Sequence, residues 1–242
     1  MATELKIRLN KYLAQAGLGS RRSVEKYIFS GQVRVNGERI TSPGHQVVAG
    51  KDSVVFDGNP VFVDTIPTYI MLNKPRGYIT TAKDEKNRDT VFHLVHTAAR
   101  VFPVGRLDRD SEGLLLLTND GEFANRLLHP RYKVEKTYLV TLNKPAEKGL
   151  EQKFRDGVTI DKGVLVHGKL DFGNDPRRRY AVIIIREGKN RQVRKMFARF
   201  GLRVTKLVRV QIGPLKLGTL KPGQWRYLSD KELQQLKATT GL

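Results

Sequence analysis

Residues 105–121 read GRLDRDSEGLLLLTNDG, a charged loop that runs directly into an apolar segment. The four consecutive leucines Leu114–Leu117 are typical of a strand that is buried on both faces of a sheet. Asp108 would then stand at the edge of that sheet, between Arg106 and Arg109 in the loop. A neighbouring guanidinium keeps a carboxylate ionised and oriented, which suits a nucleophile or a base. The same residues also fit a surface loop of arginine–aspartate ion pairs, so this segment alone leaves both interpretations open.

A second charged segment, residues 186–209, carries nine basic residues and one acidic residue. Its apolar residues recur at helical spacing, which leaves Arg191, Arg194 and Lys195 to polar surroundings. Together with Lys189, they are the strongest candidates in the chain for contact with an RNA backbone. A solvated helix face is the plainer alternative, because most charged residues are simply exposed.

The charge of the whole chain points to a polyanionic partner. Forty-four Lys and Arg residues against 24 Asp and Glu residues give 242 residues a formal net charge of +20. Nucleic acid is the commonest partner of such a protein. The basic residues are not gathered on one amphipathic helix, and no apolar run is long enough to span a bilayer, so we expect no membrane association.

Several classes of chemistry are excluded by what the sequence lacks. It has no cysteine, which removes disulfides, thiolate zinc sites, iron–sulfur clusters and cysteine nucleophiles. His93 and His96 lie three residues apart, but no acidic cluster joins them as metal ligands. No glycine-rich loop for a triphosphate or a dinucleotide is present. We therefore expect an activity without metal, ATP or redox cofactor.

The chain divides into two predicted domains, residues 1–64 and 65–242. In the first, two helices precede short strands, and Asn36-Gly37 predicts a tight hairpin turn. Arg21 and Arg22 open the second helix, where backbone amides already favour phosphate, so both are candidate RNA-binding residues. The second domain alternates predicted strands and helices, which indicates an α+β fold. One of its strands contains Tyr138, a residue type that by itself is more often core than catalyst.

Several segments taken together resemble the RNA pseudouridine synthases. They are GRLD at 105–108, SEGLLLLTNDG at 111–121, KTY at 136–138 and EGKNRQVRKM at 187–196, with MLNKPRG at 71–77 as the opening strand and turn. The N-terminal segments LNKYLA, GSRR and GQVRVNG resemble the RNA-binding module first known from a small-subunit ribosomal protein. The bacterial ribosomal branch of the synthases carries this module, and the likeness extends over almost the whole chain.

The resemblance implies roles for particular residues. Asp108 corresponds to the catalytic aspartate, Tyr138 to the active-site tyrosine, and Arg194 to the arginine that pairs with the aspartate. Arg106 corresponds to an arginine that lies near the flipped nucleotide. An apolar residue that packs beneath the uracil is expected within residues 212–220. The implied fold is a small N-terminal α/β RNA-binding module followed by a mixed-sheet catalytic domain.

The implied reaction is isomerisation of a uridine in ribosomal RNA to pseudouridine, by a cytoplasmic monomer without cofactors. The spacing of the shared segments favours 23S over 16S ribosomal RNA, free or within a pre-ribosomal particle. A 16S enzyme is the nearest alternative. A non-catalytic ribosome-assembly factor would need only the basic faces. A carbon-5 uridine methyltransferase would need a methyl-donor pocket and usually a cysteine, which this chain lacks.

Overall fold

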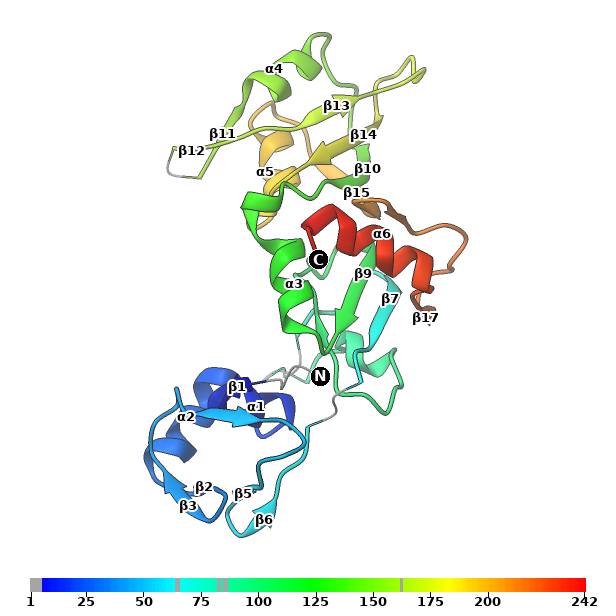
Figure 1. The fold of residues 1–242 in the computed structure, drawn as a ribbon. Coiled ribbons are helices and arrows are strands. Elements are labelled where there is room, and N and C mark those ends of the chain that lie inside the picture. The colour runs from blue at the N-terminus through cyan, green and yellow to red at the C-terminus, as the bar shows by residue number, and fades with distance from the viewer. Residues whose placement is uncertain (1–5, 64–65, 82–83, 85–86, 162) are drawn as a thin grey trace. The chain divides into compact units, whose positions relative to one another are not determined.

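The computed structural model of the chain describes residues 6–63, 66–81, 84, 87–161 and 163–242. The chain forms two units, coloured along the sequence in Figure 1: Met1–Thr68 with Thr97–Val101, and Tyr69–His96 with Phe102–Leu242. Each unit has a hydrophobic core of its own. The boundary expected between residues 64 and 65 falls on two residues outside the described part of the chain.

The first unit is built from short elements around a small core. They are β1 (Lys6–Arg8), α1 (Leu9–Gln15), α2 (Arg21–Phe29), β2 (Val33–Val35), β3 (Glu38–Ile40), β4 (Gln46–Val48), β5 (Val54–Phe56) and β6 (Asn59–Pro60). Ser20 caps α2, because its hydroxyl oxygen accepts a hydrogen bond from the backbone N–H of Ser23 at 3.1 Å. Asn36 and Gly37 have φ values of 51° and 83°, the left-handed pair that a tight β2–β3 hairpin requires. The two expected helices and the Asn-Gly hairpin are confirmed.

The second unit is organised around one mixed sheet. Its elements are β7 (Tyr69–Lys74), η1 (Val91–His93), β8 (Phe102–Pro103), β9 (Glu112–Thr118), α3 (Gly121–Leu128), η2 (Pro130–Tyr132), β10 (Lys136–Leu142), α4 (Leu150–Asp156), β11 (Val158–Ile160), β12 (Val164–Val166), β13 (Lys169–Asp171), β14 (Tyr180–Ile185), α5 (Gln192–Ala198), β15 (Val204–Ile212), β16 (Leu215–Lys216), β17 (Trp225–Tyr227) and α6 (Asp230–Thr240). The strand order is β13-β14-β10-β15-β9-β7-β17, with β8 beside β9 and β16 beside β15. The pairing of β15 with β9 is parallel and its neighbours are antiparallel, which confirms the mixed sheet.

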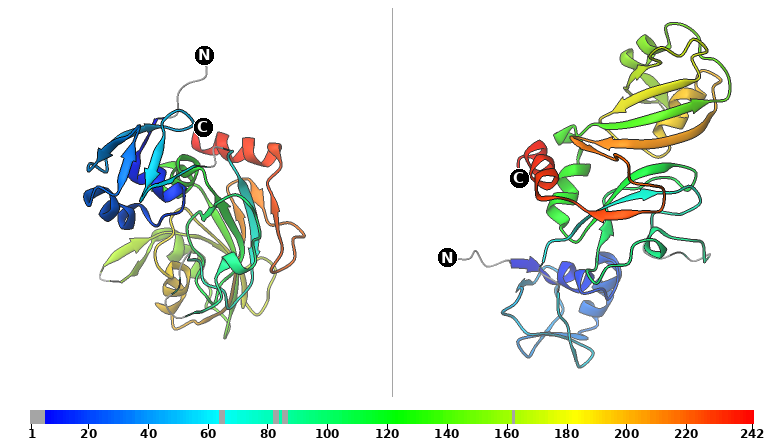
Figure 2. Two further views of the ribbon diagram at one scale, coloured as in Figure 1. Left: turned by 90° about the horizontal axis from the view of Figure 1, so that it is seen from below. Right: turned by 90° about the vertical axis from the view of Figure 1, so that its right-hand side faces the viewer.

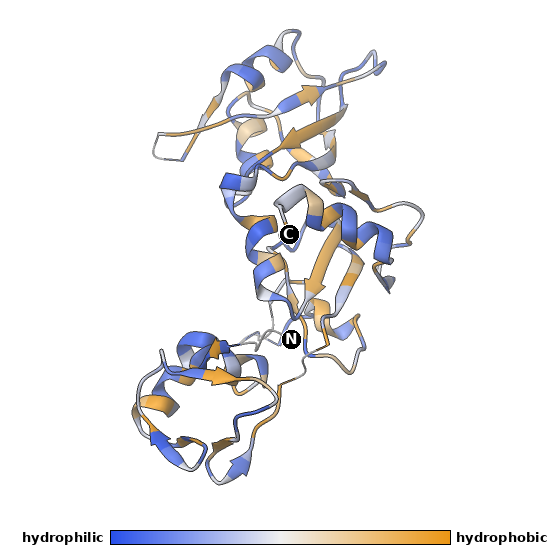
Figure 3. Ribbon diagram, viewed as in Figure 1, coloured by the Kyte–Doolittle hydropathy of each residue, from blue (hydrophilic) through white to orange (hydrophobic). Residues whose placement is uncertain are grey.

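The strand β9 forms the centre of the core in this unit. Leu114 and Leu116 pack with Phe123 of α3 and Leu236 of α6, the two helices that cover this face of the sheet (Figure 2). The alternate leucines within Leu114–Leu117 point to the other face and are also fully buried. Figure 3 shows the resulting band of apolar residues along β9. The expectation of a strand buried on both faces is therefore confirmed.

A close approach of two backbones places the loop before β9 against the middle of β15. The parallel pairing joins Glu112 to Val208 and Gly113 to Arg209. Gly113 has a φ of 103°, and a Cβ atom at this position would lie 2.2 Å from the backbone oxygen of Arg209. Glycine alone permits this contact, because any side chain would have to push the two strands apart.

We expect Gly113→Ala to lower the free energy of unfolding by about 3 kcal/mol, the combined effect of overpacking and left-handed strain. Denaturant unfolding measures this change. Gly218→Ala is the matched control, because Gly218 has a φ of 61° but open space around its Cβ position. The control should lose only about 1 kcal/mol. Equal losses in the two variants would contradict the importance of the close approach.

Candidate functional site

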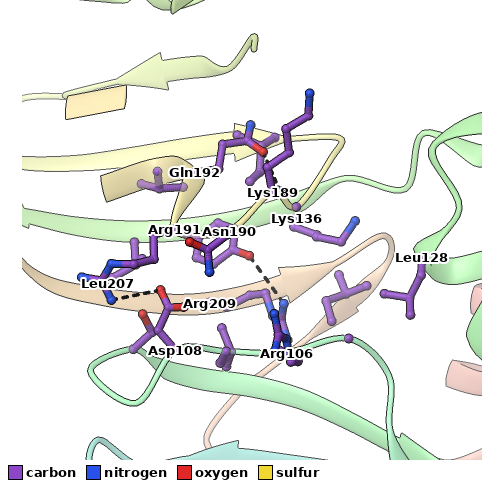
Figure 4. Close-up of a pocket in the computed structure, with 18 of the residues that line it drawn as sticks. Arg106, Asp108, Leu128, Lys136, Lys189, Asn190, Arg191, Gln192, Leu207 and Arg209 are labelled. Carbon is purple, nitrogen blue, oxygen red and sulfur yellow. Dashed lines mark hydrogen bonds and ion pairs between the residues drawn. The ribbon is translucent and has the colours of Figure 1, made fainter. Parts of the chain in front are cut away.

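A cavity of about 240 Å³ lies in the second unit where the Asp108 loop meets β10 and β15 (Figure 4). The segment that joins β14 to α5 forms its remaining wall. The ionisable residues that line it in the described part of the chain are Arg106, Asp108, Lys136, Tyr138, Lys189, Arg191 and Arg209. Asp108 is thus a single carboxylate among five cations, an arrangement suited to an anionic ligand such as RNA.

The backbone around Asp108 is held on both sides. Lys74 is fully buried, and its ammonium donates hydrogen bonds to the backbone oxygens of Asp108 at 3.1 Å and Ser111 at 2.8 Å. Before Asp108, the hydroxyl of Thr80 donates to the backbone oxygen of Leu107 at 2.9 Å. The Asp108 side chain keeps 28% of its surface exposed. A fixed backbone with an accessible carboxylate is what a reacting acid group needs.

The partner expected for Arg194 is not the one that the structure shows. Its guanidinium donates to the backbone oxygen of Asp110 at 2.9 Å and lies 3.3 Å from the Asp110 carboxylate. Arg191 is the arginine that approaches Asp108, with 3.7 Å between Nη1 and Oδ2. The expected Arg194–Asp108 pairing is therefore corrected. Arg191 immediately precedes α5 and Arg194 lies in its first turn, so their guanidiniums converge on Asp110.

Asp110 is an anchor for both arginines. Partial burial alone would raise its pKa, but the hydrogen bond from Arg191 and the charge of Arg194 lower the pKa of this carboxyl below its usual value. Arg194 also donates to the hydroxyl of Ser111 at 3.3 Å and to the backbone oxygen of Val204 at 2.8 Å. These contacts bind the loop to α5 and β15, so Arg194 acts on Asp108 through the loop that carries it.

Tyr138 lies on the cavity wall, as expected, and has two basic neighbours that the sequence reasoning missed. It pairs with Arg209 across β10 and β15, and the Arg209 guanidinium donates to the Tyr138 hydroxyl at 3.5 Å. Lys136 is two residues before Tyr138 on the same strand and also lines the cavity. Lys136 could have been found from the sequence, because side chains two residues apart on a strand share one face of the sheet. Arg209 could not, because only the register of two distant strands brings it beside Tyr138.

The other predicted RNA-binding residues occupy different surroundings. Arg106, Lys189 and Arg191 are exposed residues that line the cavity. Lys195 is not among the lining residues, and its ammonium instead pairs with Asp161 at 2.5 Å. The remaining two, Arg21 and Arg22, are exposed at the start of α2 in the first unit.

The apolar part of the cavity wall comes from several strands. Within the expected stretch 212–220, Ile212 lines the cavity. Leu207 of β15 and Ile185 of β14 add apolar surface outside that stretch. A planar base could rest against these side chains, since ligand cavities combine apolar walls with a few polar groups.

The described part of the chain shows neither a cluster of metal ligands nor a membrane-spanning helix. Among the described residues, no group of three or more His, Asp or Glu side chains could hold a metal ion. None of the described helices combines the length and apolar character needed to cross a bilayer.

Two family profiles match the chain, one mostly within the second unit and the other within the first. The profile described as RNA pseudouridylate synthase matches residues 68–199. The profile of the S4 domain matches residues 7–53. The first match covers the Asp108 loop, Tyr138 and α5, and the second covers α2 with Arg21 and Arg22.

Whole proteins are similar to the chain along most of its length. A Bacillus subtilis protein named ribosomal large subunit pseudouridine synthase B is 40% identical over 235 residues, 96% of this chain and 96% of the relative. The Escherichia coli dual-specificity RNA pseudouridine synthase RluF is 37% identical over 242 residues, 98% of this chain and 80% of the relative. A crystal structure of pseudouridylate synthase has 32% identity and a TM-score of 0.70, and the match covers 95% of this chain and 99% of that one.

Proposed function

The chain belongs to the RNA pseudouridylate synthase family and is an RNA pseudouridine synthase; from this premise we propose that it modifies a specific uridine of ribosomal RNA, with Asp108 as the catalytic carboxylate. The observation that carries the proposal is the position of Asp108, which is the single carboxylate among the ionisable side chains that line the described cavity. Its backbone is anchored by Lys74, so the carboxylate is held where a substrate would enter.

The reaction is an isomerisation that needs no imported group. The bond between N1 of uracil and C1′ of ribose breaks, and a bond between C5 and C1′ forms. The proton on C5 leaves, and N1 gains a proton, so atoms and charge balance. Asp108 acts at the sugar, either by attack on C1′ or as a base that removes a ribose proton.

The surrounding residues prepare the nucleotide for this step. The target base must leave its stack to enter the cavity, and the exposed Arg106, Lys189 and Arg191 at the cavity are suited to its phosphates. Tyr138 provides an aromatic ring on the wall, against which a base stacks. Arg194 holds the loop of Asp108 through Asp110 and Ser111.

The substrate is large-subunit ribosomal RNA, free or in a pre-ribosomal particle. The similarity to the Bacillus subtilis large subunit pseudouridine synthase B over 96% of both chains supports 23S rather than 16S ribosomal RNA. The S4-domain match and the net charge of +20 support a large RNA as the partner. We place the enzyme in the cytoplasm, where ribosomal RNA is made in bacteria, and propose that it acts as a monomer.

Release of tritium from C5 tests the substrate assignment, because the C5 proton is lost in the reaction. Unmodified transcripts of 23S and 16S ribosomal RNA, each made with 5-tritiated uridine, are incubated with the enzyme. We expect near-stoichiometric release from the 23S transcript alone, also when EDTA is present after the RNA has been folded. Release from the 16S transcript alone would overturn the large-subunit assignment.

Arg21 and Arg22 should contribute to RNA binding but not to chemistry. For the double variant Arg21→Ala, Arg22→Ala, we expect Kd for 23S transcript to rise about tenfold, and the slope of log Kd against log salt to fall by about 2. The rate at saturating enzyme should stay within about twofold, because neither residue lines the described cavity. Filter binding and single-turnover assays measure the two quantities. A lower rate with unchanged Kd would contradict this role.

A further inference from the structure

Lys136 and Arg209 are two buried cations on the wall of the cavity. Their residues are 7% and 3% exposed, respectively. Arg209 is the cross-strand neighbour of Tyr138, and Lys136 precedes Tyr138 by two residues, so the three side chains share one face of the sheet. All three line the cavity that contains Asp108.

Neither cation has a carboxylate partner within 4 Å among the described residues. The Lys136 ammonium has three donors, and its one hydrogen bond to a described residue goes to the backbone oxygen of Val134 at 3.2 Å. Arg209 donates from Nε to the backbone oxygen of Leu114 at 2.7 Å, while its buried Nη2 has no hydrogen-bond partner within the described part of the chain.

The buried Lys74 provides a useful comparison. Its ammonium donates to three backbone oxygens, those of Pro75, Asp108 and Ser111, so its hydrogen-bonding capacity is used. Buried charges are normally paired or fully hydrogen-bonded, because an unsatisfied charge destabilises the fold. Lys136 and Arg209 depart from this rule, and they do so on the wall of the reaction cavity. What they lack is an acceptor that carries negative charge.

The cations of the cavity fall into two classes by exposure. Arg106, Lys189 and Arg191 are exposed, whereas Lys136 and Arg209 are buried. Phosphates stay hydrated at the surface of a bound RNA, so the exposed cations suit them. The buried pair suits the part of the nucleotide that enters most deeply, which is the flipped base.

We propose that Lys136 and Arg209 bind the carbonyl oxygens of the flipped uracil and stabilise the negative charge that the base acquires when its N1–C1′ bond breaks. This inference rests on the proposed function. The electron pair of the broken bond goes to the base and is shared by N1, O2 and O4. C5 then bonds to C1′, the C5 proton leaves, and N1 takes a proton. Fixed cations in a dry site stabilise such developing charge far better than water does.

The pH dependence of the reaction rate is one test of this role of Lys136. Burial, and secondarily the charge of Arg209, lowers the pKa of Lys136 to about 8. The charged form therefore predominates below pH 8 and is lost above it, so the single-turnover rate should fall as pH rises through about 8. Burial also lowers the pKa of Lys74, which holds the Asp108 backbone, to about 8, and this residue is unchanged in Lys136→Arg. Lys136→Arg keeps its charge at these pH values and should therefore make the fall shallower than in the wild type. The wild type and Lys136→Arg share all the other ionisable groups that line the cavity, which are Arg106, Asp108, Tyr138, Lys189, Arg191 and Arg209.

Lys136→Met is the decisive variant, because methionine keeps much of the volume and removes the charge. We expect its single-turnover rate on the 5-tritiated 23S transcript to fall by about 10² or more, the effect of removing one donor from a charge-stabilising site. Kd for the RNA should stay within about threefold, and Lys136→Arg should recover part of the rate. Lys169→Met, a change of an exposed lysine on β13 of the same sheet, should leave rate and Kd unchanged.

The thermal stability of Lys136→Met distinguishes a role of Lys136 in charge stabilisation from a role in holding the fold. Removing a buried cation without an acidic partner should leave the Tm of Lys136→Met equal to or above that of the wild type. Arg209 is a poorer first target, because its Nε also holds the backbone of β9.

Two results would overturn the inference while the wild type is active: an unchanged rate in Lys136→Met, and a rate loss that is matched by a lower Tm. If the rate is unchanged and the salt slope of RNA binding is lower by about 1, Lys136 contacts a phosphate instead. An inactive wild type on both ribosomal RNAs would instead contradict the proposed function, so the two failures are distinguishable.

Discussion

Replacing Asp108 by asparagine should reduce the single-turnover rate of pseudouridine formation by at least about 10³, the scale of losing a required catalytic group. The amide has nearly the same size as the carboxylate, but it can neither attack C1′ nor accept a ribose proton at a useful rate. The anchoring bonds from Lys74 and Ser111 involve the backbone of residue 108, so they persist in the variant. Affinity for the 23S transcript should therefore stay within a few fold, as measured by filter binding.

Asp110→Asn separates a catalytic aspartate from a structural loop. Asp110 holds the ion pairs with Arg191 and Arg194, whereas among the described residues the one cation within 4 Å of the Asp108 carboxylate is Arg191, at 3.7 Å. If the loop were merely a network of ion pairs, Asp110→Asn would be the more damaging change. We expect the reverse for the rate, together with a larger fall of Tm in Asp110→Asn. Asp89→Asn, at a side chain that is 68% exposed, is the matched neutral control.

RNA affinity should depend steeply on salt. With a net charge of +20 and exposed arginines in both units, we expect about six to ten phosphates to be neutralised. Kd for the 23S transcript would then rise by about 10³ to 10⁵ between about 50 and 200 mM salt, because binding releases condensed counterions.

Titrations at several salt concentrations with magnesium held constant measure this dependence. Asp108→Asn should have the same slope as the wild type, because its change lies at the reacting sugar and not at a phosphate. A slope of log Kd against log salt shallower than about −2 would contradict an electrostatic account of RNA binding.

Local sequence patterns were sufficient for much of the fold. Four leucines in a row predicted β9, and the Asn36-Gly37 pair predicted the β2–β3 hairpin, because each signal depends on residues adjacent in the chain. The position of Asp108 at the edge of a buried strand followed from the same reasoning. Its place in a cavity with Tyr138 required the family resemblance.

Contacts between distant segments were beyond that reasoning. The interpretation of Arg194 as the partner of Asp108 was wrong, because the approach of α5 to the loop decides which carboxylate each arginine reaches. Arg209 was overlooked because only the register of β15 with β10 brings it beside Tyr138. Lys195 has helical spacing suited to RNA, but the structure pairs it with Asp161. Such side-chain partners are properties of the tertiary fold.

Pseudouridine mapping of ribosomal RNA tests the central claim most directly. Ribosomal RNA from cells that lack the protein is compared with that from cells complemented with the wild type or with Asp108→Asn. We predict a 23S uridine that becomes pseudouridine with the wild type and stays uridine in the other two strains. An identical pseudouridine pattern in all three strains, or restoration of the missing site by Asp108→Asn, would contradict the account.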